Sequence, residues 1–141
     1  MVRPDKHLAR KFLRMLLGRE ILAHKERMED IPAEIEELFD DANGELAIGE
    51  LPAAIEKYRQ CVDQFPAFFD GWHALGMTLM KNGNYPEAIE AGKKAVELRP
   101  NDQLAWSSLS LFYVRNSQIK EAEAAGAKAR ILSWGGKIVR D

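Results

Sequence analysis

A 34-residue repeat constrains the fold of this chain more than any other feature of its sequence. Trp72 precedes Trp106 by this interval, and four further identical pairs share the same register. Five identities in one register indicate internal duplication, and a period of this length decides the architecture before any local propensity does. The other pairs are Leu75 and Leu109, Ala88 and Ala122, Ala95 and Ala129, and Leu98 and Leu132.

A weaker copy precedes these two at the same interval. Its Ala54 and Pro66 are identical to the residues 34 positions later, while Leu38, Ala42 and Cys61 keep only the apolar or small character. The sequence therefore predicts three repeats, which cover about 35–68, 69–102 and 103–136.

Each copy contains two blocks of apolar residues at helical spacing, separated by a short polar break. In the second copy residues 82–84 form the break, and Pro86 opens the next helix, where its missing N–H costs little. Gly49 and Pro52 do the same in the first copy. Each copy is therefore predicted to be a helix hairpin, with helices at 34–47, 52–64, 70–81, 86–98, 103–115 and 119–132.

The repeats resemble the tetratricopeptide repeat (TPR) family, whose pattern combines Trp, Leu, Gly and Tyr in the first helix with Ala and Phe in the second and a closing Pro. The resemblance implies an all-α fold, a right-handed solenoid of three helix hairpins. It is carried in the second copy by Trp72, Leu75, Gly76, Leu79, Tyr85, Ala88, Ala95 and Pro100. The third copy contributes Trp106, Leu109, Ser110, Tyr113, Ala122 and Ala129, and the first keeps Ala42, Ala54, Tyr58 and Pro66.

Two positions depart from the family pattern. The aromatic residue expected in each second helix is present as Tyr58 but becomes Gly92 and Gly126 in the later copies. Those hairpins must fill the space in another way. The small residues would let paired helices approach closely, and we expect Trp72 and Trp106 to pack between successive hairpins as part of the scaffold.

The composition is that of a folded protein: 141 residues, 46% hydrophobic, 30% charged, with a net charge of −2. This length suits one domain, and the charge gives no reason to expect nucleic acid as a partner. No apolar run approaches the roughly 20 residues of a membrane span. A lone cysteine, Cys61, requires no oxidising compartment, so we predict a cytoplasmic location.

No arrangement of residues points to catalysis. His7, His24 and His73 are widely separated in the sequence, and the single cysteine adds no second ligand at metal-binding spacing. The acidic pairs at 36–37 and 40–41 suit a solvated helix face. We therefore expect no enzyme activity, no catalytic or metal site and no cofactor.

The family resemblance implies that the first helices of the repeats line a concave groove, which would bind a partner protein or peptide. Methionine adapts to irregular surfaces, so we expect a partner with apolar anchors. The alternative is that some of these side chains face the core. By the resemblance, the groove residues are Phe39, Asp40, Asn43, His73, Ala74, Met77, Met80, Lys81, Ser107, Ser108, Leu111 and Arg115.

One class within this family clamps the C-terminal carboxylates of chaperones with lysine, arginine and asparagine at fixed groove positions. Here only Asn43 matches, because the other positions carry Phe39, Ala74, Leu104 and Ser108. The missing cations would each supply a charge-assisted hydrogen bond. The sequence therefore argues against a carboxylate clamp of that kind.

Residues 1–28 are predicted to form a basic amphipathic helix ahead of a TPR domain at 29–141. They carry eight Lys or Arg against three Asp or Glu, a net of +5, whereas the remaining 113 residues carry twelve against nineteen, a net of −7. The apolar band of this helix is too wide to remain in water. It could be covered by the same chain, by a neighbouring chain or by a membrane surface, of which the membrane is the least favoured.

Two functions follow from these features. The first is an adaptor or assembly factor that binds a partner protein or peptide through the groove. The alternative is a structural subunit that self-associates, or is built into a larger complex, through its terminal helices. A defined homo-oligomer without other partners would favour the second function.

Overall fold

The computed structural model describes residues 31–140, and every helix in this part agrees with the sequence prediction to within one residue at each end. The amphipathic helix predicted for residues 1–28 lies outside the described residues. The six helices are α3 (Ala33–Ala47), α4 (Leu51–Gln64), α5 (Phe69–Lys81), α6 (Tyr85–Leu98), α7 (Gln103–Arg115) and α8 (Ile119–Ser133).

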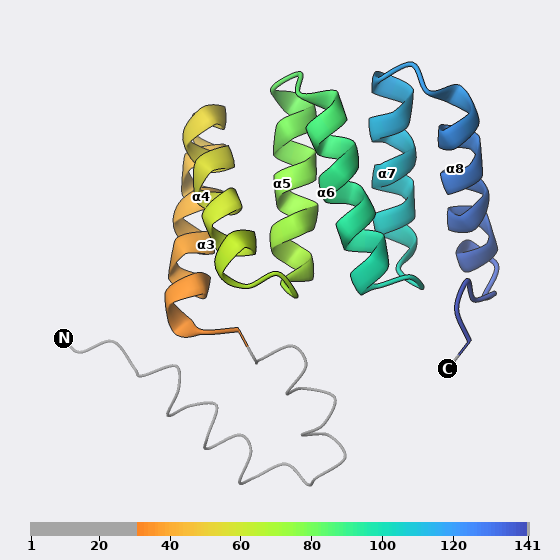
Figure 1. Cartoon of the computed structure of the whole chain (residues 1–141), viewed down its shortest axis with the longest axis horizontal. Coiled ribbons are helices and arrows are strands. Elements are labelled where there is room, and N and C mark those ends of the chain that lie inside the picture. Colours follow the sequence, from red (N-terminus) through yellow and green to blue (C-terminus); the bar gives the residue numbers. More distant parts are fainter. Residues whose placement is uncertain (1–30, 141) are drawn as a thin grey trace, which may run out of the picture. The chain divides into compact units, whose positions relative to one another are not determined.

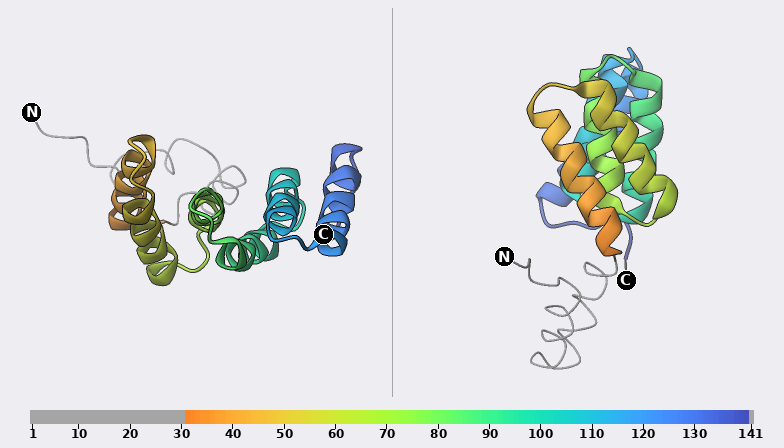
Figure 2. Two further views of the ribbon diagram at one scale, coloured as in Figure 1. Left: turned by 90° about the horizontal axis from the view of Figure 1, so that it is seen from above. Right: turned by 90° about the vertical axis from the view of Figure 1, so that its left-hand side faces the viewer.

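Consecutive helices pair into hairpins, and the hairpins stack (Figure 1). Helices α5 and α6 form one hairpin and α7 and α8 the next, with α4 packed on α5 and α7 packed on both α6 and α5. In the first hairpin Tyr58 of α4 lies against Phe39 of α3 and donates its hydroxyl hydrogen to Asn43 Oδ1 at 2.6 Å. Seen from above, α5 to α8 follow one another along the stack (Figure 2, left). The described chain is therefore a solenoid of three helix hairpins, as the sequence predicts.

The three hairpin turns share one backbone geometry at the same repeat position. Gly49, Gly83 and Ser117, each 34 residues apart, have left-handed φ values of 82°, 83° and 60°. After each of them, the next residue donates its N–H back to a carbonyl five residues earlier, as in Asn84 to Leu79 at 2.8 Å and Gln118 to Tyr113 at 2.8 Å. This is the Schellman closure of a helix, and glycine adopts it without a Cβ penalty.

Ser117 is the one residue of this set that carries a Cβ in the left-handed region. Because that conformation costs a non-glycine residue about 1 kcal/mol, Ser117→Gly should raise the free energy of unfolding by about 0.5–1 kcal/mol. Urea denaturation of the full chain measures the change. Ser133→Gly, at the end of α8 and without a positive φ, is the control and should not stabilise.

Small side chains form the contacts between paired helices, as expected. Ala42, Ala54 and Ala88 are fully buried, and Cys61 occupies the same kind of position as a small residue with no exposed surface. The remaining members of this buried set are Ala95, Ala122 and Ala129.

The two repeat tryptophans are less buried than the sequence suggested. Trp72 and Trp106 pack against the core but remain partly exposed, whereas Leu75 and Leu109 are buried. Each indole N–H donates to the carbonyl of the proline before its helix, Pro66 or Pro100, at 2.7 Å in both cases. The polar edge of each indole is therefore tied to the connection between hairpins, which leaves part of the ring at the surface.

The space left by the glycine at position 92 is filled by an aromatic side chain from the next hairpin. A Cβ built on Gly92 would lie 3.0 Å from Leu109 Cδ1 and 3.0 Å from Phe112 Cδ2, and one on Gly76 would lie 2.8 Å from Phe112 Cε2. The Phe112 ring is fully buried. The aromatic group missing from the second helix of this repeat is thus supplied by α7.

The two helical glycines at this repeat position should respond in opposite ways to alanine. Gly92→Ala must displace the Phe112 ring, which Gly76 confines from the other side. We therefore expect the free energy of unfolding to fall by about 1 kcal/mol. Gly126→Ala meets only Ser110 Oγ at 3.4 Å and Arg130 Nη1 at 3.8 Å, so it should gain most of the ~1 kcal/mol by which alanine exceeds glycine in a helix. Urea unfolding of both full-length variants tests the pair, and changes of the same sign would contradict this packing.

Candidate interaction face on α5 and α7

The groove residues predicted on α5 share one side of that helix. His73, Met77, Met80 and Lys81 follow one another at intervals of four, three and one, which brings them onto a single stripe at 100° per residue. On α7, Ser108, Leu111 and Arg115 make the corresponding stripe at intervals of three and four. We call these two stripes together the α5–α7 face.

A polar contact joins the two stripes at one end. His73 Nε2 lies 2.9 Å from Ser108 Oγ, and the imidazole stacks on the ring of Phe69 with centroids 6.0 Å apart. The guanidinium carbon of Arg99 in turn lies 4.1 Å from the centroid of the Phe69 ring. His73 and Ser108 are therefore in direct contact across α5 and α7, and the imidazole is also held by the ring of Phe69.

Burial lowers the pKa of His73 below its ordinary value of 6.5, because the charged imidazolium would lose its water. The carboxylates of Asp102 and Asp70 oppose this effect but do not overcome it. The imidazole is therefore neutral near pH 7, and it can donate or accept a hydrogen bond.

The middle of the face is apolar and its far end is basic. Met77 and Met80 are partly buried against the core, and Leu111 keeps 37% of its surface exposed. Lys81 and Arg115 occupy equivalent positions in the last turns of α5 and α7, and both are exposed. The two helix ends add partial negative charge that favours cations at these positions.

The groove residues predicted on the first hairpin have other contacts. Phe39 packs edge-on against Phe68 with centroids 4.9 Å apart and also lies against Tyr58 at 5.6 Å. Asn43 accepts the Tyr58 hydrogen bond, and Asp40 is exposed on the same helix. The alternative that some groove residues face the core thus applies to Phe39, which is part of an aromatic cluster between α3, α4 and the start of α5.

Ser107 and Ala74 complete the predicted set. Ser107 is exposed and lines a hollow of about 290 Å³ together with Ser110 of α7 and Gly126 and Arg130 of α8. Ala74 is partly buried against the core, and its carbonyl accepts the Thr78 hydroxyl at 2.7 Å.

The positions of a carboxylate clamp carry no cation. Leu104 is 62% exposed at the start of α7, Ser108 is buried and bonded to His73, and Ala74 and Phe39 are packed against the core. The amide oxygen of Asn43 is engaged by Tyr58. No cation at these positions is therefore present to form an ion pair with a terminal carboxylate.

Reactive groups are scarce in the part of the chain that the structure describes. Burial raises the pKa of the Cys61 thiol from 9.0 to about 11, so the thiolate that would act as a nucleophile is disfavoured. Among residues 31–140 no three His, Cys, Asp or Glu side chains lie together as a metal site would require. Within the same range no helix is long and apolar enough to cross a membrane.

Comparison with known proteins supports the repeat fold. The family model described as "Tetratricopeptide repeat" matches residues 69–102. The sequence has no match among curated proteins.

Solved structures share the fold at low sequence identity. The crystal structure of MamA is 24% identical with a TM-score of 0.68, over 72% of this chain and 59% of that one, so the chain spans less than two thirds of MamA. The Sgt2 TPR domain from Aspergillus fumigatus is also 24% identical with a TM-score of 0.68, over 75% of this chain and 70% of that one. The second TPR of Spaghetti (RPAP3), bound to the HSP90 peptide SRMEEVD, is 20% identical with a TM-score of 0.66, over 71% and 93%.

A hairpin solenoid with this repeat defines a class of helical-repeat proteins that includes protein-interaction modules. Residues 69–102 match the tetratricopeptide repeat itself, and the solved structures share the helical-hairpin fold of the chain.

Sequence reasoning missed two features of this region. Arg99 and Phe69 flank His73 and fix its surroundings, and Trp72 borders a surface hollow on the other side of α5. The first could have been suspected because Phe69 lies four residues before His73 on one helix face. The second depends on side chains from three helices and has no sequence signal.

Protonation of His73 should destabilise the folded chain. The pKa of His73 is lower in the folded than in the unfolded state. The stabilisation by the neutral imidazole is therefore fully present above about pH 6.5, and it declines as the pH falls below that value. Between about pH 7.5 and 5.5, urea unfolding should show a larger fall in the free energy of unfolding for the native sequence than for His73→Gln, which cannot titrate. Equal losses would show that His73 is not desolvated in the folded chain.

Proposed function

We propose that this chain is a protein-interaction module that binds a segment of a partner protein on the α5–α7 face. The observation that carries the proposal is the row of accessible apolar side chains, Met77 and Leu111, at matching positions of consecutive hairpins. One solved TPR domain of similar fold is bound to a peptide. Catalysis has no comparable support, because the described residues hold neither an activated nucleophile nor a metal cluster.

The chemistry of the face defines the partner. The apolar centre suits one or two apolar anchors of a peptide or helix, and flexible methionines can adjust to their shape. Lys81 and Arg115 at the basic end favour an acidic residue beside those anchors. A terminal carboxylate recognised by a clamp, as chaperone tails would offer, does not fit, since the clamp positions carry no cation.

The two ends of the face differ in chemistry, which would orient a bound segment. His73 and Ser108 lie at the start of each stripe, and Lys81 and Arg115 lie at its end, about two helical turns away. A bound segment would therefore meet the neutral imidazole of His73 at one end and two cations at the other. This asymmetry favours one orientation of the segment over the reverse.

Such a module would act as an adaptor or assembly factor. Its cytoplasmic location remains a prediction, which is based on the single cysteine. A structural subunit that self-associates remains the alternative function. Either way the binding face is formed by a rigid scaffold, because the helices that carry it are packed on both neighbours in the stack.

Selection of peptides from a random library on the full chain tests the proposal. We expect enriched sequences with apolar anchors next to an acidic residue, and at least about tenfold weaker binding to the double variant Met77→Glu, Leu111→Glu. Circular dichroism must show that this variant keeps its helices, because both positions border the core. Lys81→Glu with Arg115→Glu provides a second variant at exposed positions, and it should disfavour the acidic residue of the bound peptide.

The matched control places two glutamates at exposed apolar positions outside the face. Ile48 is 74% exposed and Ile119 is 54% exposed, so Ile48→Glu with Ile119→Glu adds the same charge with little change in packing. Equal loss of binding in the control and in both face variants would show that net charge, not the α5–α7 face, governs binding.

A further inference from the structure

A second hollow lies away from the α5–α7 face, where α4, α5 and α6 meet. It has a volume of about 260 Å³. Its apolar lining comes from Val62 of α4 and from Trp72 and Leu75 of α5, and carboxylates of α4 and α6 border it. The hollow therefore combines an aromatic ring with an acidic rim, and the proposed function uses neither.

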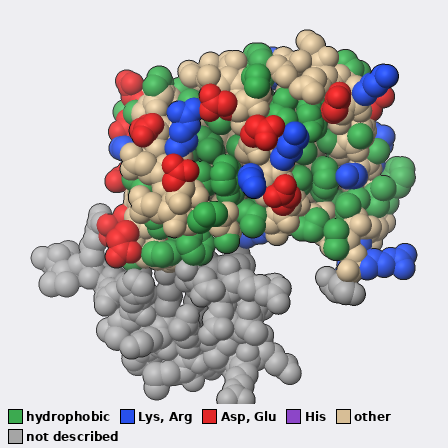
Figure 3. Space-filling view, viewed as in Figure 1, with side chains coloured by type: hydrophobic (Ala, Val, Ile, Leu, Met, Phe, Trp, Pro, Cys, Tyr) green, Lys and Arg blue, Asp and Glu red, His purple; other side chains and the backbone are tan. Residues whose placement is uncertain are grey.

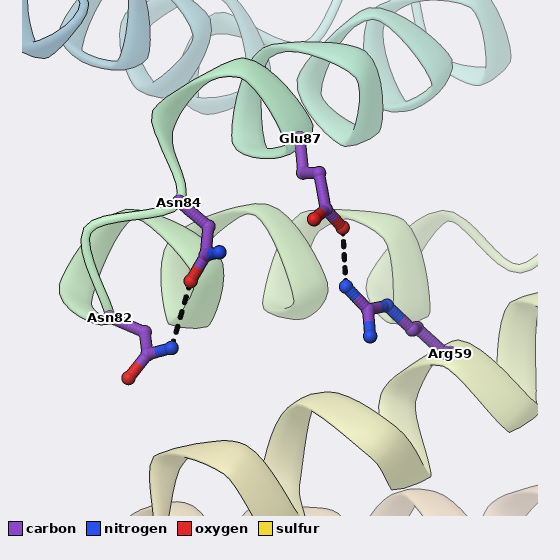
Figure 4. A network of polar contacts seen from close by, with 4 residues as sticks. All are labelled: Arg59, Asn82, Asn84 and Glu87. Atoms are coloured by element: carbon purple, nitrogen blue, oxygen red, sulfur yellow. Dashed lines mark hydrogen bonds and ion pairs between the residues drawn. The ribbon is translucent and has the colours of Figure 1, made fainter.

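The rim holds more negative than positive charge. Asp63, Glu87 and Glu90 contribute three carboxylates and Arg59 one guanidinium, and Lys93 pairs with Glu90 at 3.2 Å from outside the lining, which leaves a net of −1. Arg59 is paired with Glu87 across α4 and α6 (Figure 4). On the face where α4 and α6 lie in front, charged side chains of both signs surround hydrophobic ones (Figure 3).

The equivalent tryptophan of the third hairpin, Trp106, has a lysine over its ring. In the third hairpin the Lys128 ammonium lies 4.3 Å from the centroid of the Trp106 ring. The residue at the Lys128 position in the second hairpin is Lys94, and it lies 3.7 Å from Glu97 instead. The acidic Glu90 replaces Ala124 of the third hairpin. The hollow at Trp72 thus has the ring and an additional acid, but its own lysine is directed elsewhere.

We propose that this hollow receives a lysine or arginine side chain from the basic segment 1–28 of a second copy of the chain. Its aliphatic stem would lie on Val62 and Trp72, and its charged end would face Asp63 and Glu90. The combination of cation–π attraction, stem burial and opposite charge is the one that selects a long basic side chain.

Charge complementarity indicates this occupant. Residues 1–28 carry a net charge of +5 and the rest of the chain a net of −7, so each copy brings both a basic segment and an acidic hollow. Two copies can exchange these elements reciprocally, which closes a symmetric dimer. Ion pairs of exposed groups are screened by salt, so the dimer should weaken as ionic strength rises.

Carbodiimide cross-linking of the full chain tests the proposal, because this reagent joins a carboxylate directly to an amine that it contacts. A mixture of unlabelled and nitrogen-15-labelled chains is cross-linked, digested and analysed by mass spectrometry. We expect mixed-isotope peptide pairs that join Lys6, Lys11 or Lys25 to Asp63, Glu87 or Glu90. Pairs of one isotope only would show contact within a chain and overturn the second-copy assignment.

Variants of the acidic rim test whether binding in the hollow produces these cross-links. Asp63→Asn with Glu90→Ala, the residue that the third hairpin carries there, should lower the yield of cross-links to Glu87 by about threefold or more. Glu123→Ala removes an exposed acid of α8 from outside the rim and should leave that yield unchanged. No cross-link to the rim, or the same yield at Asp41 and Glu121, would overturn the proposal. Because the α5–α7 face is intact in these variants, peptide binding there remains a separate measurement.

Discussion

The packing of one aromatic ring holds the second and third hairpins together. Phe112 of α7 inserts into a notch whose two sides are Gly76 of α5 and Gly92 of α6, and its ring is fully buried. A Cβ at either glycine would enter the space of the ring. A helix hairpin cannot bury its own apolar face, so this contact between neighbours is what makes the stack a folded unit.

That contact also positions the candidate face. Leu109 and Phe112 fix α7 on the second hairpin, and the adjacent side of α7 then carries Leu111 and Arg115. The bond between His73 and Ser108 spans the same pair of helices. The proposed binding face therefore depends on the core packing between α7 and the second hairpin.

The third hairpin shows how the same repeat presents an outer surface. Ile89 and Val96 are buried on α6, whereas the equivalent residues of α8 are the exposed Glu123 and Arg130. Gly126 keeps the small size of Gly92 although no ring of the described residues fills its notch. The alanine-rich α8 can thus expose its outer face, because its charged residues lie where a neighbouring hairpin would otherwise pack.

The sequence alone determined the helices, their pairing and the repeat, because a 34-residue period and helical apolar spacing are local properties that need no partner to be recognised. It also indicated the small residues of the helix contacts, and it placed His73 and Ser108 on one proposed surface. Only the tertiary structure decided which large side chains are buried. Phe39 joined an aromatic cluster, Trp72 and Trp106 stayed partly exposed because their indole N–H groups bind proline carbonyls, and Phe112 took the place of an aromatic missing from another helix. The physical reason is that the burial of a side chain depends on which residues a neighbouring hairpin places opposite it. The spacing of residues along one helix does not determine those contacts.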